Sequence, residues 1–396
     1  MKCEWKMVAF GNLLQEPVRN GLTKPKAIRG AGVKMIAMGE IFAYSRIANI
    51  VTDRVPVTEK ELQNCSIKPL DLLFARQSLS LEGAGKCSIV TDVSEDTVFE
   101  SHLIRARMDQ RKADPFFLYY YFNSPHGKEN IKSIVEQVAA AGIRGSDLIR
   151  LFVPYPSLEK QRKISTILRC LDDKIELNNV INNNLEQQAQ ALVAEYIERT
   201  PFSSTFSDIM DFVNGFAFQS NTYLPIGKYK IITIKNVQDG YIDSMNCAYI
   251  DSLPQRMKAN CILDIGDVLL SLTGNVGRVG IVCEKNLLLN QRVAKIVPAD
   301  KRLLPFLYFV FRQSSIKTKL ETIAKGTAQL NLSPVETLKL TIPYEENSAI
   351  LLSQALEPLY QKIIFNNQEI NLLVLLRDTL LPKLMSGELD VSDIDL

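Results

Sequence analysis

Residues 164–196 read ISTILRCLDDKIELNNVINNNLEQQAQALVAEY, and mostly apolar side chains recur in them at alternating spacings of four and three. This heptad seam consists of Ile164, Leu168, Leu171, Ile175, Asn178, Asn182, Leu185, Ala189, Leu192 and Tyr196. A stripe with this period lines one face of an α-helix that packs against another helix. The stretch therefore predicts a long helix with a helical partner.

A second seam in the same phase occupies residues 352–384. It consists of Leu352, Leu356, Leu359, Ile363, Asn366, Ile370, Leu373, Arg377, Leu380 and Leu384, and an asparagine again holds its fifth place. Pro358 lies inside it, and a proline in a helix interior costs about 3 kcal/mol. We therefore expect this helix to begin afresh at Pro358, and Pro382 to bend or end it.

The chain before each seam is also repeated. Gly85–Val90 (GKCSIV) recurs as Gly277–Val282 (GRVGIV), and Phe117–Tyr120 (FLYY) recurs as Phe306–Phe309 (FLYF). A globular domain followed by a helix has been duplicated. We predict globular domains at 1–156 and 200–345, a first helix at 157–199, and a second helix with an acidic tail at 346–396.

Each globular domain is predicted to have an α+β fold. Short apolar runs between glycine, proline and polar clusters indicate strands at Leu70–Phe74, Cys87–Val90 and Val98–Ile104. Phe116–Phe122 is compatible with a strand, but its apolar counterpart in the repeat favours a buried helix. Ser157 is a predicted N-cap for the first long helix.

The two long helices are expected to form an intramolecular antiparallel coiled coil. The short connection from Ile197 to Phe206 reaches at most about 27 Å, which predicts globular domains at opposite ends of the pair. A seam from Ile164 to Tyr196 spans about 48 Å at 1.5 Å per residue.

A pseudo-two-fold through this pair sets Asn182 opposite Asn366, with Asn178 as a further polar seam residue. Paired polar groups fix register at a cost in stability. The alternative is that these asparagines are merely tolerated at wet positions.

Composition excludes several classes of protein. With 46 Lys and Arg against 44 Asp and Glu, the net charge of +2 lacks the basicity of a histone-like binder. Seven cysteines without a C-x-x-C pair indicate neither a disulfide framework nor a zinc ribbon, so we expect reduced thiols in a cytoplasmic protein. No signal peptide or apolar run long enough for a membrane span is evident.

Catalytic motifs are missing from the sequence, so we expect no catalytic residue, metal or cofactor. His102 and His126 are too few for a multi-histidine site and are interpreted as ordinary surface or packing residues. Residues 83–87 resemble the tail of a phosphate loop, but Ser80 and Cys87 replace its glycine and its Ser/Thr. The counterpart at 275–279 indicates a glycine turn between strands, carrying one basic residue, in both copies.

Loop residues that suit phosphates or base edges are candidates for contacts with nucleic acid. They are Arg76, Lys86, Arg144, Lys235, Asn236, Asn275, Arg278, Gln291, Arg292, Lys325 and Gln329. The alternative interpretation is that they are ordinary solvated loop residues.

The chain resembles the specificity subunit of type I restriction–modification systems. The resemblance is strongest over 154–192, which contains PYPSLEKQRKI and LDDKIELNNVINNNLEQQAQAL, and continues in Leu376–Glu388. Gly215–Ser220 and Leu289–Val293 are similar to pieces of that family's target-recognition domains. The resemblance covers essentially the whole chain.

This resemblance implies a non-catalytic DNA-binding subunit. Each globular domain would read one half of a bipartite site in double-stranded DNA. The helices would fix the gap and dock two methyltransferase subunits, and restriction subunits would join the complex. The rival readings are a coiled-coil scaffold without DNA specificity and an enzyme with a cryptic site.

Overall fold

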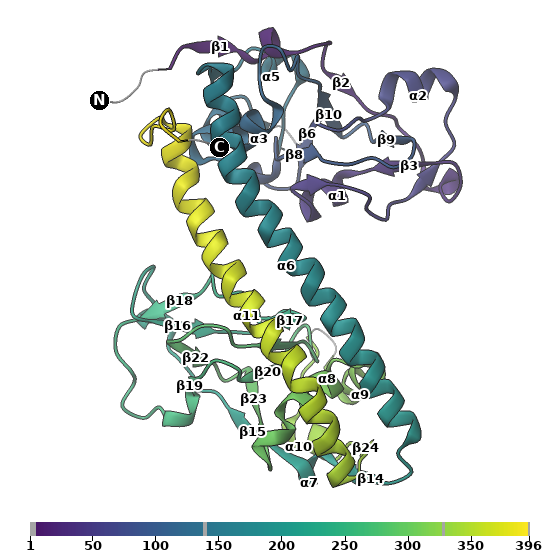
Figure 1. The fold of residues 1–396 in the computed structure, drawn as a ribbon, viewed down its shortest axis with the longest axis vertical. Helices are drawn as coiled ribbons and strands as arrows, with labels where there is room; N and C mark the ends of the chain where they lie inside the picture. The colour runs from purple at the N-terminus through teal and green to yellow at the C-terminus, as the bar shows by residue number, and fades with distance from the viewer. Residues whose placement is uncertain (1–4, 138–140, 327–328, 395–396) are drawn as a thin grey trace. The chain divides into compact units, whose positions relative to one another are not determined.

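In the computed structural model, the described residues are 5–137, 141–326 and 329–394, and the chain forms two compact units. The first unit is Met1–Asp173 with Val374–Leu396, and the second is Lys174–Leu373. The long helices α6 (Leu158–Arg199) and α11 (Glu346–Met385) each contribute to both units (Figure 1).

A five-stranded sheet lies at the centre of the first unit. Its order is β2 (Arg19–Asn20), β10 (Leu103–Ala106), β6 (Leu72–Ala75), β8 (Cys87–Val90) and β4 (Arg46–Ile47). Neighbours are antiparallel except β8 and β4. The single strand predicted at Val98–Ile104 was wrong, because the chain turns at Glu100–Leu103 between β9 (Thr97–Phe99) and β10.

Three smaller sheets complete the strands of this unit. They are β1 (Met7–Ala9) with β13 (Phe152–Pro154); β5 (Arg54–Val55), β3 (Val33–Ile36) and β9; and β11 (Glu136–Gln137), β12 (Ala141–Gly142) and β7 (Gln77–Ser78). The short helices are α1 (Met38–Ala43), α2 (Glu59–Cys65), α4 (Pro125–Lys132) and α5 (Gly145–Leu148).

The aromatic run forms the buried helix α3 (Pro115–Asn123), as the sequence predicts. Asp114 caps it, because its Oδ1 accepts a hydrogen bond of 2.8 Å from the Phe117 amide. A helix that is apolar on all sides belongs in a core. Its counterpart α8 (Leu304–Phe311) is buried in the second unit in the same way.

The second unit repeats the five-stranded sheet. Its order is β15 (Met210–Asn214), β23 (Val293–Pro298), β20 (Val268–Ser271), β21 (Val279–Ile281) and β17 (Gly240–Tyr241), and only β21 and β17 are parallel. The remaining strands are β14 (Ser203–Thr205) with β24 (Thr341–Pro343), and β18 (Ala248–Ile250), β16 (Tyr229–Ile232), β22 (Leu287–Leu289) and β19 (Ile262–Leu263). The short helices are α7 (Phe206–Ile209), α9 (Ser314–Ile323) and α10 (Pro334–Leu338).

Individual backbone hydrogen bonds also recur, which confirms the duplication. The amide of Ala75 donates to the carbonyl of Lys86 at 2.9 Å, and the amide of Ser271 donates to that of Arg278 at 2.9 Å. Lys86 and Arg278 are therefore equivalent. Each follows a glycine with positive φ, 77° at Gly85 and 78° at Gly277, so the predicted glycine turns are present.

The two long helices pack together as the predicted antiparallel pair. The α6 helix begins after Ser157, whose Oγ accepts from the Lys160 amide at 3.3 Å, as expected of an N-cap. Seam residues such as Ile164 and Leu168 are buried in the core of the first unit, and Ala189, Leu356 and Ile363 in that of the second. The helices are thus integral to both globular cores.

Polar contacts between the helices establish the antiparallel direction. In the second unit, Asn366 donates to Asn182 at 2.8 Å, and Asn178 donates to Glu369 at 2.7 Å. In the first unit, Arg377 donates to Asp172 at 2.9 Å. As the residue number falls along α6, from 182 to 172, the number of its partner on α11 rises from 366 to 377. The charged seam residue Arg377 is accommodated because this contact pairs it.

The prediction that the second helix begins afresh at Pro358 was wrong, because α11 runs continuously through it. A proline lacks the amide that would bond the carbonyl four residues earlier, here that of Gln354. Both residues are exposed, so water can bond that carbonyl. Pro382 lies in the last turn, and the helix ends at Met385.

Candidate nucleic-acid interface

Three loops of the second unit meet at one end of the strands of its five-stranded sheet, where β20 ends and β23 begins. The amide of Leu272, just after β20, donates to the carbonyl of Arg292 at 3.1 Å, and the amide of Gly274 donates to that of Leu330 at 3.0 Å. Thr273 Oγ1 also donates to Asn331 Oδ1 at 2.9 Å. These bonds hold the segments as one surface.

Most of the predicted contact residues of this unit lie on that surface. Asn275, Gln291, Arg292, Lys325 and Gln329 are exposed there. Arg278 is half-buried, and its Nη1 donates to Gln238 Oε1 at 2.8 Å. Lys235 is exposed on the turn that follows β16. Such side chains offer the donors and acceptors that phosphates and base edges require.

Asn236 does not belong with them, and its assignment as a contact residue is corrected. Its side chain is buried, with Oδ1 accepting from the Thr233 amide at 2.9 Å and Nδ2 donating to the Asp243 carbonyl at 2.8 Å. Because both the oxygen and the nitrogen of this side-chain amide are hydrogen-bonded within the turn, the side chain cannot also contact a base. Asn236 shapes the loop that presents Lys235.

The first unit has the same edge. Arg76 directly follows β6, and its amide donates to the carbonyl of His102 at 2.7 Å while its carbonyl accepts from the Ile143 amide at 2.9 Å. Arg144 is exposed next to Ile143 and donates to Glu136 at 2.6 Å. Arg76 and Arg144 therefore lie together on this edge.

Lys86 lies on the adjoining glycine turn and faces a cavity of about 500 Å³. Its Nζ donates to the Phe42 carbonyl at 2.9 Å, and Lys128 and Lys132 also line the cavity. Burial, with a contribution from Lys128, lowers the pKa of Lys86. Glu82 and Glu129 line the cavity as well, so its three lysines leave an excess of one positive charge, which favours an anion such as a phosphate.

His102, which the sequence suggested is an ordinary surface or packing residue, is exposed on this surface. Its Nδ1 lies 2.8 Å from Oε1 of Gln77, the first residue of β7. The signal that would have found it is the repeat itself, since the turn before β10 matches the turn that carries Gln291 and Arg292 before β23.

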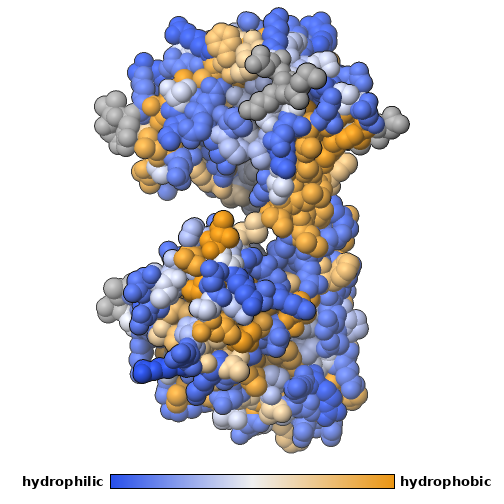
Figure 2. Space-filling model, turned by 90° about the vertical axis from the view of Figure 1, so that its left-hand side faces the viewer, coloured by the Kyte–Doolittle hydropathy of each residue, from blue (hydrophilic) through white to orange (hydrophobic). Residues whose placement is uncertain are grey.

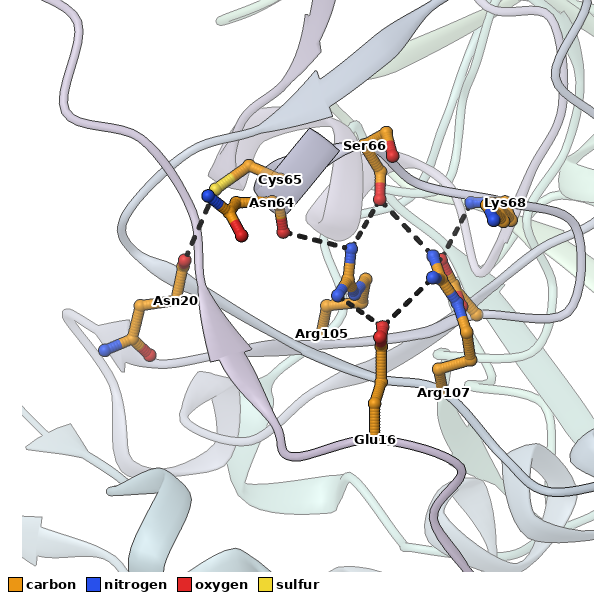
Figure 3. Close-up of polar contacts among 9 residues, drawn as sticks. Glu16, Asn20, Asn64, Cys65, Ser66, Lys68, Arg105 and Arg107 are labelled. Atoms are coloured by element: carbon orange, nitrogen blue, oxygen red, sulfur yellow. Dashed lines mark hydrogen bonds and ion pairs between the residues drawn. The ribbon is translucent and has the colours of Figure 1, made fainter. Parts of the chain in front are cut away.

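A partly buried ionic network anchors β10, the strand that follows this turn (Figure 3). Arg105 of β10 and Arg107 both reach Glu16, at 2.6 and 3.0 Å, and Arg107 also binds Asp71 through two bonds of 2.7 Å. Arg105 additionally donates to the carbonyl of Ser66. Burial lowers the pKa of Arg105, although Asp71 and Glu16 oppose this. The network fixes β10 directly behind His102.

The helices present a separate, apolar surface. Leu351, Phe365 and Leu372 on α11 are 66%, 56% and 68% exposed, and Leu177 and Val180 on α6 are 52% and 57% exposed. Figure 2 shows apolar residues gathered on the exposed stretch of the helices. We call these five residues the helix stripe. Large exposed apolar side chains in groups indicate a surface for a protein partner.

A family model described as the type I restriction modification DNA specificity domain matches residues 4–187 and again 203–374. The chain belongs to this family. Its two matches coincide with the duplicated arrangement of sheet, aromatic helix and long helix.

Relatives of this specificity-domain chain match along most of their length. The MjaIX specificity subunit of Methanocaldococcus jannaschii is 25% identical, over 94% of this chain and 90% of the relative. The HindI specificity subunit of Haemophilus influenzae is 22% identical, over 82% and 87%. The crystal structure of a type I restriction–modification S subunit from M. genitalium shares the fold, with a TM-score of 0.57, 16% identity and 96% coverage of both chains.

Across the residues that the structure describes in this family member, no group of His, Cys, Asp and Glu side chains is placed to hold a metal ion. Within the same residues, no helix is long and apolar enough to cross a membrane. The six cysteines that can be described, from Cys65 to Cys283, are free thiols.

Proposed function

We propose that this chain is the specificity subunit of a type I restriction–modification complex, and that each recognition domain reads one half of a bipartite sequence in double-stranded DNA. The observation that carries the proposal is the repeated loop edge. In the first unit these loops carry Arg76 and Arg144, and the adjoining glycine turn carries Lys86; in the second unit the equivalent turns carry Arg278 and Arg292 and are held by the same backbone bonds. A duplicated reader is what a two-part site requires.

The recognition domains would be residues 1–156 and 200–345, and the helical segments 157–199 and 346–396. The helices would fix the gap between the half-sites, and the helix stripe would dock two methyltransferase subunits. Restriction subunits would join through that complex. The chain itself would act in the cytoplasm, without catalysis and without a cofactor.

The net charge of +2 fits a subunit that shares the DNA with its partners. Affinity for DNA depends on the number of phosphates neutralised. A nearly neutral chain can supply a few lysines and arginines at its loop edges, while the methyltransferase subunits supply further contacts.

Selection from random-sequence DNA tests this function. The chain would be purified with its methyltransferase partner, and bound DNA would be sequenced after several rounds. We expect enrichment of two short motifs separated by a gap of constant length. Salt-sensitive binding without any enriched motif would contradict sequence specificity and would favour a coiled-coil scaffold that joins proteins.

A second experiment tests the spacer. One heptad added to each long helix at facing positions keeps the seam in phase and lengthens the pair by about 10 Å. We expect the selected gap to lengthen while both half-site motifs stay unchanged. A changed motif would show that the helices take part in reading bases.

A further inference from the structure

Four backbone hydrogen bonds define the turn before β10, and all four recur before β23. Before β10, the amide of Glu100 donates to the carbonyl of Ile36 at 2.9 Å. The amide of Ser101 donates to that of Leu22 at 2.9 Å, and the amide of Leu103 to that of Glu100 at 3.0 Å. Before β23, the amide of Asn290 donates to the carbonyl of Ile232 at 3.2 Å. The amide of Gln291 donates to that of Phe216 at 3.0 Å, and the amide of Val293 to that of Asn290 at 2.9 Å. The fourth bond runs from the Arg76 amide to the His102 carbonyl in the first unit. Its counterpart in the second unit runs from the Leu272 amide to the Arg292 carbonyl.

This correspondence places His102 where the second unit has Arg292. Gln77 is likewise equivalent to Thr273, because Gln77 pairs with Gly142 and Thr273 pairs with Asn331 in the matching bridge. His102 and Gln77 are exposed, as Arg292 is. The two side chains therefore occupy the surface that presents contact residues in the other copy.

The hydrogen bond between them determines what they offer a ligand. Because Gln77 Oε1 can only accept, Nδ1 of His102 donates in this contact, and in the tautomer that carries its single proton on Nδ1 the Nε2 atom is an acceptor. The amide nitrogen of Gln77 remains a donor. The pair presents a donor beside an acceptor, which complements the N7 acceptor and N6 donor of adenine in the major groove.

We propose that His102 and Gln77 read an adenine in the half-site of the first recognition domain. This inference rests on the proposed function and assigns it a base contact. Arg105 lies on β10, three residues after His102, and its bonds to Glu16 and Ser66 anchor the strand that follows the His102 turn. His102 is in turn held to Gln77 of β7 by the hydrogen bond between their side chains. Such preorganisation keeps two adjacent groups in register with one base edge.

Selection with three variants of the full chain in its methyltransferase complex tests the assignment. For His102→Ala, we expect one adenine position of one half-site to lose about ten- to hundred-fold discrimination. The other half-site and the gap should stay unchanged. His126→Ala is the matched control, because His126 is the other histidine, is exposed, and lies on α4. It should leave the whole motif intact.

His102→Arg gives a readout that a merely structural role would not produce. Arginine donates two bonds and favours the O6 and N7 acceptors of guanine. We expect the preferred base at the affected position to change from adenine to guanine. Thermal unfolding of each variant should match the parent chain, since the residue is exposed.

The outcomes separate the inference from the function on which it rests. A parent complex that enriches no motif overturns the proposed function. A parent motif that both His102 variants reproduce unchanged overturns the assignment of His102 and leaves the function standing. A uniform loss of affinity without loss of discrimination also overturns it, because it would identify His102 as a phosphate contact.

Discussion

Asn366 of α11 donates a hydrogen bond of 2.8 Å to Asn182 of α6 across a seam that is otherwise mostly apolar. Asn182 in turn donates to Asn367 at 2.9 Å. Asn366 is fully buried, and its Oδ1 has no hydrogen-bond partner within the residues the structure describes. The contact thus fixes one alignment of the helices while leaving one polar atom unsatisfied.

We expect Asn366→Leu alone to destabilise the chain by about 1–2 kcal/mol, because Asn182 Oδ1 loses its donor. The double variant Asn182→Leu/Asn366→Leu should recover that loss and can exceed the parent stability. Urea unfolding of the full chain measures both. A double variant less stable than either single variant would mean that the asparagine pair contributes net stability.

The helices were the most predictable part of the fold because a heptad seam is a local pattern. The period and phase of the seam can be read from one continuous stretch of sequence, and the duplicated seam confirms both. The error at Pro358 has a tertiary cause. Propensity favours ending a helix there, but packing of Leu356, Tyr360 and Ile363 into the core outweighs the lost backbone bond.

The glycine turns give a prediction that separates backbone strain from crowding. Gly277→Ala should cost about 1–2 kcal/mol, since φ is 78° but the nearest atom to an added Cβ is 3.6 Å away. Gly85→Ala should cost more, because its Cβ would also collide with the Cγ2 of buried Ile131. Urea midpoints measure the difference, and equal losses would contradict the crowding argument.

The exposure and grouping of the candidate contact residues were only partly predictable from the sequence. Residue type and loop position made Arg76, Arg278, Arg292 and Asn236 candidates alike, but the Asn236 side chain is hydrogen-bonded inside its own turn. The equivalence of His102 and Arg292 could not be read from the sequence, because residue identity differs between the copies while the backbone hydrogen bonds do not. Which loop side chains are exposed, and which positions of the two copies are equivalent, depends on hydrogen bonds between segments that are distant in the chain.

Lys86 should act through its charge. If it neutralises one phosphate, Lys86→Ala should reduce the slope of log affinity against log salt by about 0.9 without altering the selected motif. Lys60→Ala, at an exposed site on α2, is the control. An altered motif with an unchanged salt slope would identify Lys86 as a base-reading residue.

The same lysine predicts a dependence on pH. Burial and Lys128 lower the pKa of Lys86, so its ammonium group loses its proton at a lower pH than an ordinary lysine does. Affinity of the parent complex should therefore fall as the solution becomes alkaline, whereas Lys86→Arg, which stays charged, should resist that fall. Parallel curves for the two proteins would exclude Lys86 from the contact.

The helix stripe contains one pair of equivalent residues. Leu177 follows seam residue Ile175 by two positions, and Phe365 follows Ile363 in the same way. Their exposed fractions are similar, at 52% and 56%. If each is the centre of one methyltransferase dock, Leu177→Asp and Phe365→Asp should each weaken one dock by at least about thirtyfold.

Light scattering of the reconstituted complex measures the result. Each single variant should bind one methyltransferase subunit in place of two, and the double variant should bind none. Gln361→Asp, at an exposed polar site on α11, should retain both. Loss of both subunits from a single variant would mean that the two docks are coupled. Retention of both by the double variant would place docking away from the helix stripe.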